Sequence, residues 1–147
     1  MRLALLRPVA MVAAFLDIAI HMYLAPMHLE EKLYIGVAFL IGSAALAVTI
    51  VALVSERDRT RTAAWVFGAA TSLVMAIAFV LSRTVGLPGQ YLETWDSSPE
   101  DVLGLVSLGL ELLFFGCCLG SITVGWTTKA SGGSRRLSVH GRVTPTV

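Results

Sequence analysis

Acidic and imidazole side chains occur inside segments that are otherwise apolar enough to cross a membrane. Asp17 and His21 lie in the first such segment, and Glu111 lies deep in the last one. An ionisable side chain is costly in hydrocarbon, so it usually faces the interior of a helix bundle and contributes to a site. Asp17 and His21 are four residues apart and therefore share one face of a helix. These three residues are the strongest functional signal in the sequence.

The same polar face continues outward past Pro26 towards the second apolar segment. At a rise of 1.5 Å per residue, Asp17 and Glu111 come to similar depths, about 12 and 13 Å below the outer boundary. Imidazole suits zinc, copper, iron and nickel, and carboxylates are common co-ligands. We therefore predict one polar pocket open towards the outside, with candidate metal ligands Asp17, His21, His28, Glu30 and Glu111. Arg83, near the outer end of the third segment, is the expected charge partner.

Copper and zinc are the metals that this ligand set favours. Met22 and Met27 flank Pro26 beside the two histidines, and thioethers favour Cu(I), although methionines in such helices are more often packing residues. Haem is less favoured, because no second axial ligand is evident at the depth of His21. Structural interpretations also stay open: His21 can simply pair with Asp17. Glu111 can pair with Arg83 or His21 to lock the bundle, or it can carry a proton.

The composition is typical of an integral membrane protein. Of the 147 residues, 56% are hydrophobic and only 14% are charged, which lies outside the range of soluble globular chains. Four apolar runs are each near the ~20 residues that cross the hydrocarbon core. They predict an all-α fold, a four-helix transmembrane bundle within residues 1–128, with helices at about 5–25, 33–54, 63–85 and 99–126. Pro26 is expected to end or kink the first helix, and residues 129–147 are expected to form a basic, disordered tail.

The basic residues predict the orientation of the bundle. Nine of the eleven fall on one side of a four-span arrangement: Arg2, Arg7, Arg57, Arg59, Arg61, Lys129, Arg135, Arg136 and Arg142. The positive-inside rule makes this side cytoplasmic. We therefore expect a multi-pass protein of the cell (plasma) membrane with both termini in the cytoplasm. Acidic residues gather on the opposite side, where they either attract cations or only solvate the outer loop.

The last segment carries two further features. Gly109, Gly116 and Gly120 form a stripe of small residues that suits close helix packing, either within the chain or in a homo-oligomer or larger membrane complex. Cys117 and Cys118 are adjacent and lack the C-x-x-C spacing of redox motifs, so we expect them to act as small apolar residues.

Motifs for catalysis and nucleotide binding do not occur in the chain. The sequence has no Walker loop, dinucleotide fingerprint, zinc-protease helix or nucleophile elbow. A net charge of +1 argues against a nucleic-acid partner. We therefore expect a binding or transport protein in the lipid bilayer rather than an enzyme.

Two stretches carry a family resemblance. The motif Arg-Thr-Val-Gly-Leu-Pro-Gly at 83–89, the acidic loop after it and Glu111 resemble the second half of small four-helix integral membrane proteins of actinobacteria. The first connection, 21–30, with its two histidines and a proline, resembles the first half of the same group. The likeness covers most of the chain up to Trp126. It implies the four-helix architecture and the choice of polar residues, and it implies no reaction.

The function predicted from these features is the binding or passage of a cation, either a transition metal or a proton, through an outward-facing intramembrane pocket. One alternative is a structural or accessory subunit of a larger membrane complex, whose polar residues only stabilise the fold. A further alternative is a small proton-coupled exporter, in which an intramembrane acid exchanges a proton for a cationic substrate.

Overall fold

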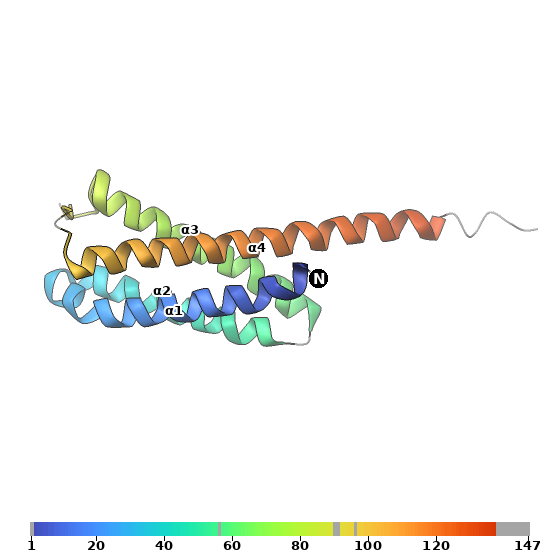
Figure 1. Cartoon of the computed structure of the whole chain (residues 1–147), viewed down its shortest axis with the longest axis horizontal. Helices are drawn as coiled ribbons and strands as arrows, with labels where there is room; N and C mark the ends of the chain where they lie inside the picture. The colour runs from blue at the N-terminus through green and yellow to red at the C-terminus, as the bar shows by residue number, and fades with distance from the viewer. Residues whose placement is uncertain (1, 56, 90–91, 96, 138–147) are drawn as a thin grey trace, which may run out of the picture.

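The fold of the described part of the chain is all-α. The computed structural model describes residues 2–137 apart from 56, 90, 91 and 96, with side chains described between residues 5 and 124 (Figure 1). Its helices are α1 (Arg2–Glu31), α2 (Leu33–Val54), α3 (Asp58–Thr84) and α4 (Pro99–Leu137). Each contains a segment long and apolar enough to cross a membrane: Leu5–Glu31, Leu33–Val54, Asp58–Thr84 and Pro99–Val124. The predicted four-helix class with four candidate spans is confirmed.

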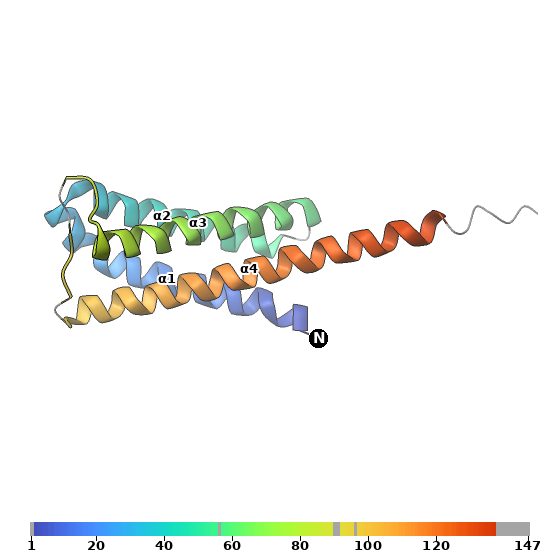
Figure 2. The ribbon, with the colours of Figure 1, turned by 90° about the horizontal axis from the view of Figure 1, so that it is seen from above.

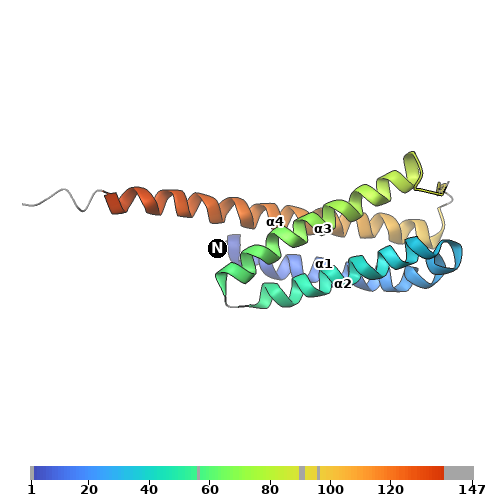
Figure 3. The same cartoon turned by 180° about the vertical axis from the view of Figure 1, so that it is seen from behind.

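The four helices pack as a ring. α1 packs against α2 and α4, and α3 packs against α4 and α2. Figure 2 shows the α2–α3 pair above α1 and α4. Seen from behind, α3 crosses its neighbours obliquely, so its C-terminal end diverges from α1 and α2 (Figure 3). The α1–α2 and α3–α4 connections lie at one end of the bundle, whereas the start of α1, the α2–α3 connection and the extension of α4 lie at the other (Figure 1).

Small side chains allow the helices to approach closely in the apolar core. Ala10, Ala13 and Ala14 form one buried face of α1, at the i, i+3 and i+4 positions of a packing stripe. On α3, a Cβ added to Gly68 would lie 2.8 Å from Thr49 Cγ2 and 2.8 Å from the ring of Phe114. Glycine is therefore required for the present packing of α3 against α2 and α4.

The two cysteines belong to this core. Cys117 and Cys118 are buried free thiols within the hydrophobic cluster that contains Phe114. The prediction that they act as small apolar residues is confirmed.

Pro26 does not end α1, which continues to Glu31. Proline removes one backbone donor, and membrane helices tolerate this when neighbouring helices and local adjustments satisfy the freed groups. A single residue, Lys32, separates α1 from α2. This tight corner requires Gly36, because a Cβ there would lie 2.6 Å from the backbone nitrogen of Leu29. The continuation of α1 places His28 in the interior of the bundle.

The C-terminal part also differs from the predicted boundary. α4 is helical through Leu137, which includes residues 129–137 of the segment expected to be disordered. Extending an existing helix avoids the cost of nucleation, and no proline occurs between Pro99 and Pro145. The remainder of the predicted tail, residues 138–147, lies outside the described residues. α3 begins at Asp58, ahead of the predicted start at 63.

The glycine stripe of α4 is divided between two environments. A Cβ added to Gly120 would lie 3.4 Å from Leu6 Cδ1 of α1, so this residue packs inside the chain. Gly109 and Gly116 have open space instead. The surface at these two glycines is therefore free to contact lipid or another membrane protein, and the predicted oligomer stays a prediction.

Candidate functional site

Three of the predicted ligands meet between α1 and α4. Asp17, His21 and Glu111 each offer one ligand atom, and these atoms lie within 4.8 Å of one another. His21 Nε2 is 3.9 Å from Asp17 Oδ1 and 3.7 Å from Glu111 Oε1. Their exposed fractions are 1% for Asp17, 6% for His21 and 4% for Glu111. The structure thus forms a buried cluster of two carboxyl groups and one imidazole.

Ser107 is a fourth member of this cluster and was not among the residues predicted from the sequence. Its hydroxyl donates a hydrogen bond to Asp17 Oδ1 and lies 3.0 Å from His21 Nε2. Ser107 stands one turn before Glu111 on α4, just as Asp17 stands one turn before His21 on α1. The equal spacing of these two pairs is the feature of the sequence that could have identified Ser107. A lone serine in an apolar helix is not distinctive, because its hydroxyl commonly bonds to the backbone of its own helix.

The cluster contains more polar atoms than its own residues satisfy. Asp17 Oδ2, His21 Nδ1 and Glu111 Oε2 are buried and have no hydrogen-bond partner among the described residues. Buried polar atoms in proteins are rarely unpaired, because losing hydration without a new bond is costly. A bound cation, proton or water would remove this deficit. The cluster is therefore a candidate binding site.

His28 and Glu30, also predicted as ligands, do not join the cluster. His28 is 11 residues after Asp17, about 16 Å further along the helix axis at 1.5 Å per residue. The Phe39 ring of α2 lies between the two imidazoles, with its centroid 4.7 Å from each of them. His28 Nδ1 instead lies 3.4 Å from Glu31 Oε2. Glu30 is exposed on another side of α1.

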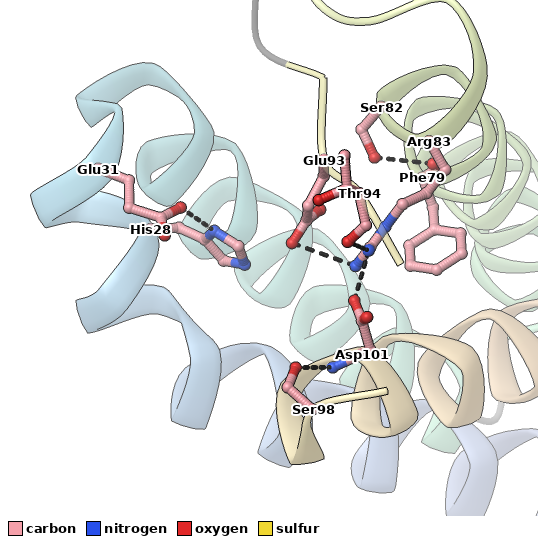
Figure 4. Close-up of polar contacts among 9 residues, drawn as sticks. All are labelled: His28, Glu31, Phe79, Ser82, Arg83, Glu93, Thr94, Ser98 and Asp101. Atoms are coloured by element: carbon pink, nitrogen blue, oxygen red, sulfur yellow. Dashed lines mark hydrogen bonds and ion pairs between the residues drawn. The ribbon is translucent and has the colours of Figure 1, made fainter. Parts of the chain in front are cut away.

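Arg83 is a charge partner, but not of Glu111. Its guanidinium reaches the α3–α4 connection and the first turn of α4 (Figure 4). Nη2 lies 3.1 Å from Glu93 Oε1, Nη1 pairs with Asp101, and Nη1 lies 3.4 Å from the carbonyl oxygen of Thr94. The divergence of α3 directs Arg83 to this loop. The sequence could not show that divergence, and the expected pairing with the cluster does not form.

Aromatic rings surround the same guanidinium. Its central carbon is 5.4 Å from the Phe79 ring centroid and 4.8 Å from that of Trp95, within cation–π range. Burial raises the pKa of the nearby Glu93 carboxyl above its ordinary value, and the opposing attraction of Arg83 and His28 does not cancel this effect. The Arg83 ion pairs therefore hold the loop against the bundle in a partly dehydrated environment.

A cavity of about 140 Å³ extends between the cluster and the Arg83 ion pairs. His21, Ser107 and Glu111 line its inner end. The side chains at the loop end include Arg83 and Glu93. Most of the remaining wall is apolar and comes from all four helices. The cavity gives the cluster a route towards the end of the bundle where the α1–α2 and α3–α4 connections lie.

The ligand chemistry of the cluster favours a divalent metal of the zinc class over Cu(I). One imidazole nitrogen and two carboxylates, with a hydroxyl beside them, suit zinc and similar ions. Metal–ligand bonds of about 2.0–2.2 Å bring tetrahedral ligands to about 3.4 Å from one another, slightly closer than the present separations. Met22 is half exposed on the outside of α1, so the thioether of a Cu(I) set is not assembled. A cavity of this size holds one small ring, which is far too little for haem.

Comparison with known proteins gives no family. No protein-family model, no curated protein and no solved structure matches the chain. The class is therefore defined by the fold and the site: an all-α bundle of four helices long and apolar enough to cross a membrane, with a buried carboxyl–imidazole cluster between α1 and α4. The resemblance to small actinobacterial membrane proteins stays a prediction.

Proposed function

We propose that this protein is a multi-pass membrane protein that binds a cation at Asp17, His21 and Glu111. One observation carries the proposal: two buried carboxyl groups and an imidazole converge in an apolar bundle, and one polar atom on each has no partner among the described residues. A cation compensates the charge of the carboxylates and gives their oxygens a partner. Such groups are expensive inside a membrane and usually mark a binding site or an ion pathway.

The pocket opens to the outside of the cell in this proposal. The cavity extends towards the connections α1–α2 and α3–α4, whereas nine of the eleven basic residues belong to the opposite side of the four-span arrangement. The positive-inside rule supports a cytoplasmic location for that basic side. The bound cation therefore exchanges with the cell exterior, and the membrane is the cell membrane.

A divalent transition metal is the first cation to test. His21 Nε2 faces both carboxyl groups and donates its hydrogen to Ser107, whose own hydrogen goes to Asp17. A metal ligand must present a bare nitrogen, so binding through Nε2 requires the imidazole hydrogen to move to Nδ1, with no net release of a proton from His21.

Zinc titration of the purified full-length protein in mild detergent tests this proposal. We expect saturable Zn²⁺ binding by calorimetry, and a loss of affinity of at least tenfold in His21→Gln and Glu111→Gln. Glu30→Gln is the matched control, because it makes the same chemical change on an exposed residue. Absence of saturable binding, or equal affinity in Glu111→Gln and Glu30→Gln, would contradict the proposal.

A structural role is the second candidate, and the Ser107 bridge favours it. This hydroxyl links Asp17 and His21 to α4 and so ties two helices together. Helices in lipid lack a hydrophobic force for association, and polar bridges can replace it. Such a role predicts that breaking the cluster lowers the thermal stability of the metal-free protein. A cation site predicts that the same variants lose binding while the metal-free stability changes little.

A further inference from the structure

The cavity above the cluster is larger than a metal ion requires. It measures about 140 Å³, and an engineered apolar cavity of about 150 Å³ binds one benzene molecule. Its wall is mostly apolar and includes Leu24, Ile35, Phe39, Met75, Phe79 and Leu108. A bare inorganic cation at the floor would contact only the polar end of this chamber.

The floor of the chamber is acidic. Glu111 and His21 line the chamber, and Asp17 lies behind them in the same cluster. Glu111 Oε2 and Asp17 Oδ2 have no partner among the described residues. A neutral ring would fill the chamber but would leave these oxygens unsatisfied. An occupant that satisfies both parts has a positive head and an apolar body.

The walls and the loop end also favour a cation. The faces of aromatic rings attract positive charge, and Phe39 and Phe79 both line the chamber. Glu93 and Glu100 line its loop end, together with Arg83. Arg83 is already engaged by Glu93 and Asp101, so carboxyl groups outnumber the basic group there. An acidic entrance concentrates cations and disfavours anions.

We propose that the pocket binds a compact organic ammonium ion with an apolar body about the size of one ring. Its ammonium group contacts the Glu111 carboxylate, with Asp17 behind it, and its body lies between Phe39 and Phe79. This inference rests on the proposed cation-binding function and names its substrate class. In a small proton-coupled exporter, an intramembrane acid would exchange a proton for such a cation.

Calorimetric titration of the full-length protein in detergent with benzylammonium tests the inference. Benzyl alcohol is the neutral analogue, and Zn²⁺ is titrated in parallel. We expect benzylammonium to bind at least tenfold more tightly than benzyl alcohol and to lose at least tenfold in Glu111→Gln. Because both cations use the Glu111 carboxylate, saturating Zn²⁺ should lower the apparent affinity for benzylammonium.

A second variant separates the chamber from the cluster. Ala78 lines the chamber, and Ala78→Phe should abolish benzylammonium binding by filling it, while Zn²⁺ affinity stays within about threefold of wild type. Ala47→Phe is the matched control, because Ala47 is exposed on α2 and does not line the chamber. Retained benzylammonium binding in a folded Ala78→Phe protein would overturn the inference.

The outcomes distinguish the two proposals. Zinc binding without benzylammonium binding would overturn the organic cation and leave the cation site in place. Equal affinity for benzylammonium and benzyl alcohol would also overturn it, because the charge would not be recognised. If neither cation binds to a folded wild-type protein, the proposed function fails as well.

Discussion

Ser107 on α4 donates a hydrogen bond to Asp17 on α1, 90 residues earlier in the chain. A serine hydroxyl has one hydrogen, so its second contact, 3.0 Å to His21 Nε2, is one in which the imidazole donates. His21 in this state therefore carries its hydrogen on Nε2 and leaves Nδ1 as a bare acceptor. Ser107 thus orients both the carboxylate and the imidazole of the cluster.

Ser107→Ala should weaken Zn²⁺ binding by about 10- to 100-fold, the usual effect of removing a residue that orients metal ligands. The cause is the loss of the hydrogen bond that orients the Asp17 carboxylate. Ser72→Ala is the matched control, because Ser72 is equally buried on α3 and its hydroxyl has no partner among the described residues. Equal zinc affinities in the two variants, measured by calorimetry, would contradict the orienting role.

Gly68→Ala should destabilise the bundle by about 1–3 kcal/mol, the typical effect of overpacking a well-packed core. The added methyl group would overlap Thr49 of α2 and Phe114 of α4, both fully buried. Gly109→Ala is the control, because a Cβ there meets open space and alanine favours the helix over glycine. Thermal unfolding in detergent should show a lower midpoint for Gly68→Ala alone. A midpoint no lower than that of Gly109→Ala would mean that α3 can shift to accept the methyl group.

Arg83→Gln should destabilise the protein by about 3–5 kcal/mol, because it leaves the buried Asp101 carboxylate without its cation. Asp101→Asn should restore part of this loss in the double variant, and the double-mutant cycle measures the coupling between the two side chains. The exposed pair Arg61 and Asp58 provides the comparison, with an expected effect of about 0–1 kcal/mol. A coupling in the Arg83 pair no larger than in the exposed pair would show that the loop is not held by this contact.

Glu93 should make the protein less stable as the pH rises above 4.5, which is the ordinary pKa of this carboxyl group. Burial raises the pKa of this carboxyl in the folded state, although Arg83 and His28 oppose the shift and Asp101 and Glu31 reinforce it. In the window between the unfolded and folded pKa values the folded state binds more protons, so stability falls with rising pH and becomes constant above the folded value.

The variant Glu93→Gln isolates this effect. Glutamine does not titrate, so the variant lacks the pH dependence that Glu93 contributes. The melting temperature of the wild type minus that of the variant should therefore be highest near pH 4.5 and should decline as the pH rises. Both proteins are measured in the same detergent from pH 4.5 to 7. A difference that grows with pH would show that the ion pair with Arg83 outweighs the cost of burial.

The buried cluster of Asp17, His21 and Glu111 was predictable from the sequence, whereas the ion pairs of Arg83 were not. Helical spacing and depth place Asp17, His21 and Glu111 together once four parallel or antiparallel spans are assumed. The partners of Arg83 depend on the oblique crossing of α3, which no local sequence pattern predicts. His28 shares a helix face with His21, yet Phe39 from a different helix separates them. Contacts that follow from spacing along a helix and from depth in the membrane were therefore predictable from the sequence, whereas contacts that depend on how the helices cross were not.

Cysteine labelling in intact cells tests the orientation on which the outward-facing pocket depends. Leu92 in the α3–α4 connection and Arg59 near the start of α3 are exposed residues at opposite ends of the bundle. Leu92→Cys should react with a membrane-impermeant thiol reagent, and Arg59→Cys should react only after the cells are permeabilised. The native Cys117 and Cys118 are buried, so the background should be low. The opposite pattern would place the basic side outside, contrary to the positive-inside rule. The cavity and its cluster would then exchange cations with the cytoplasm.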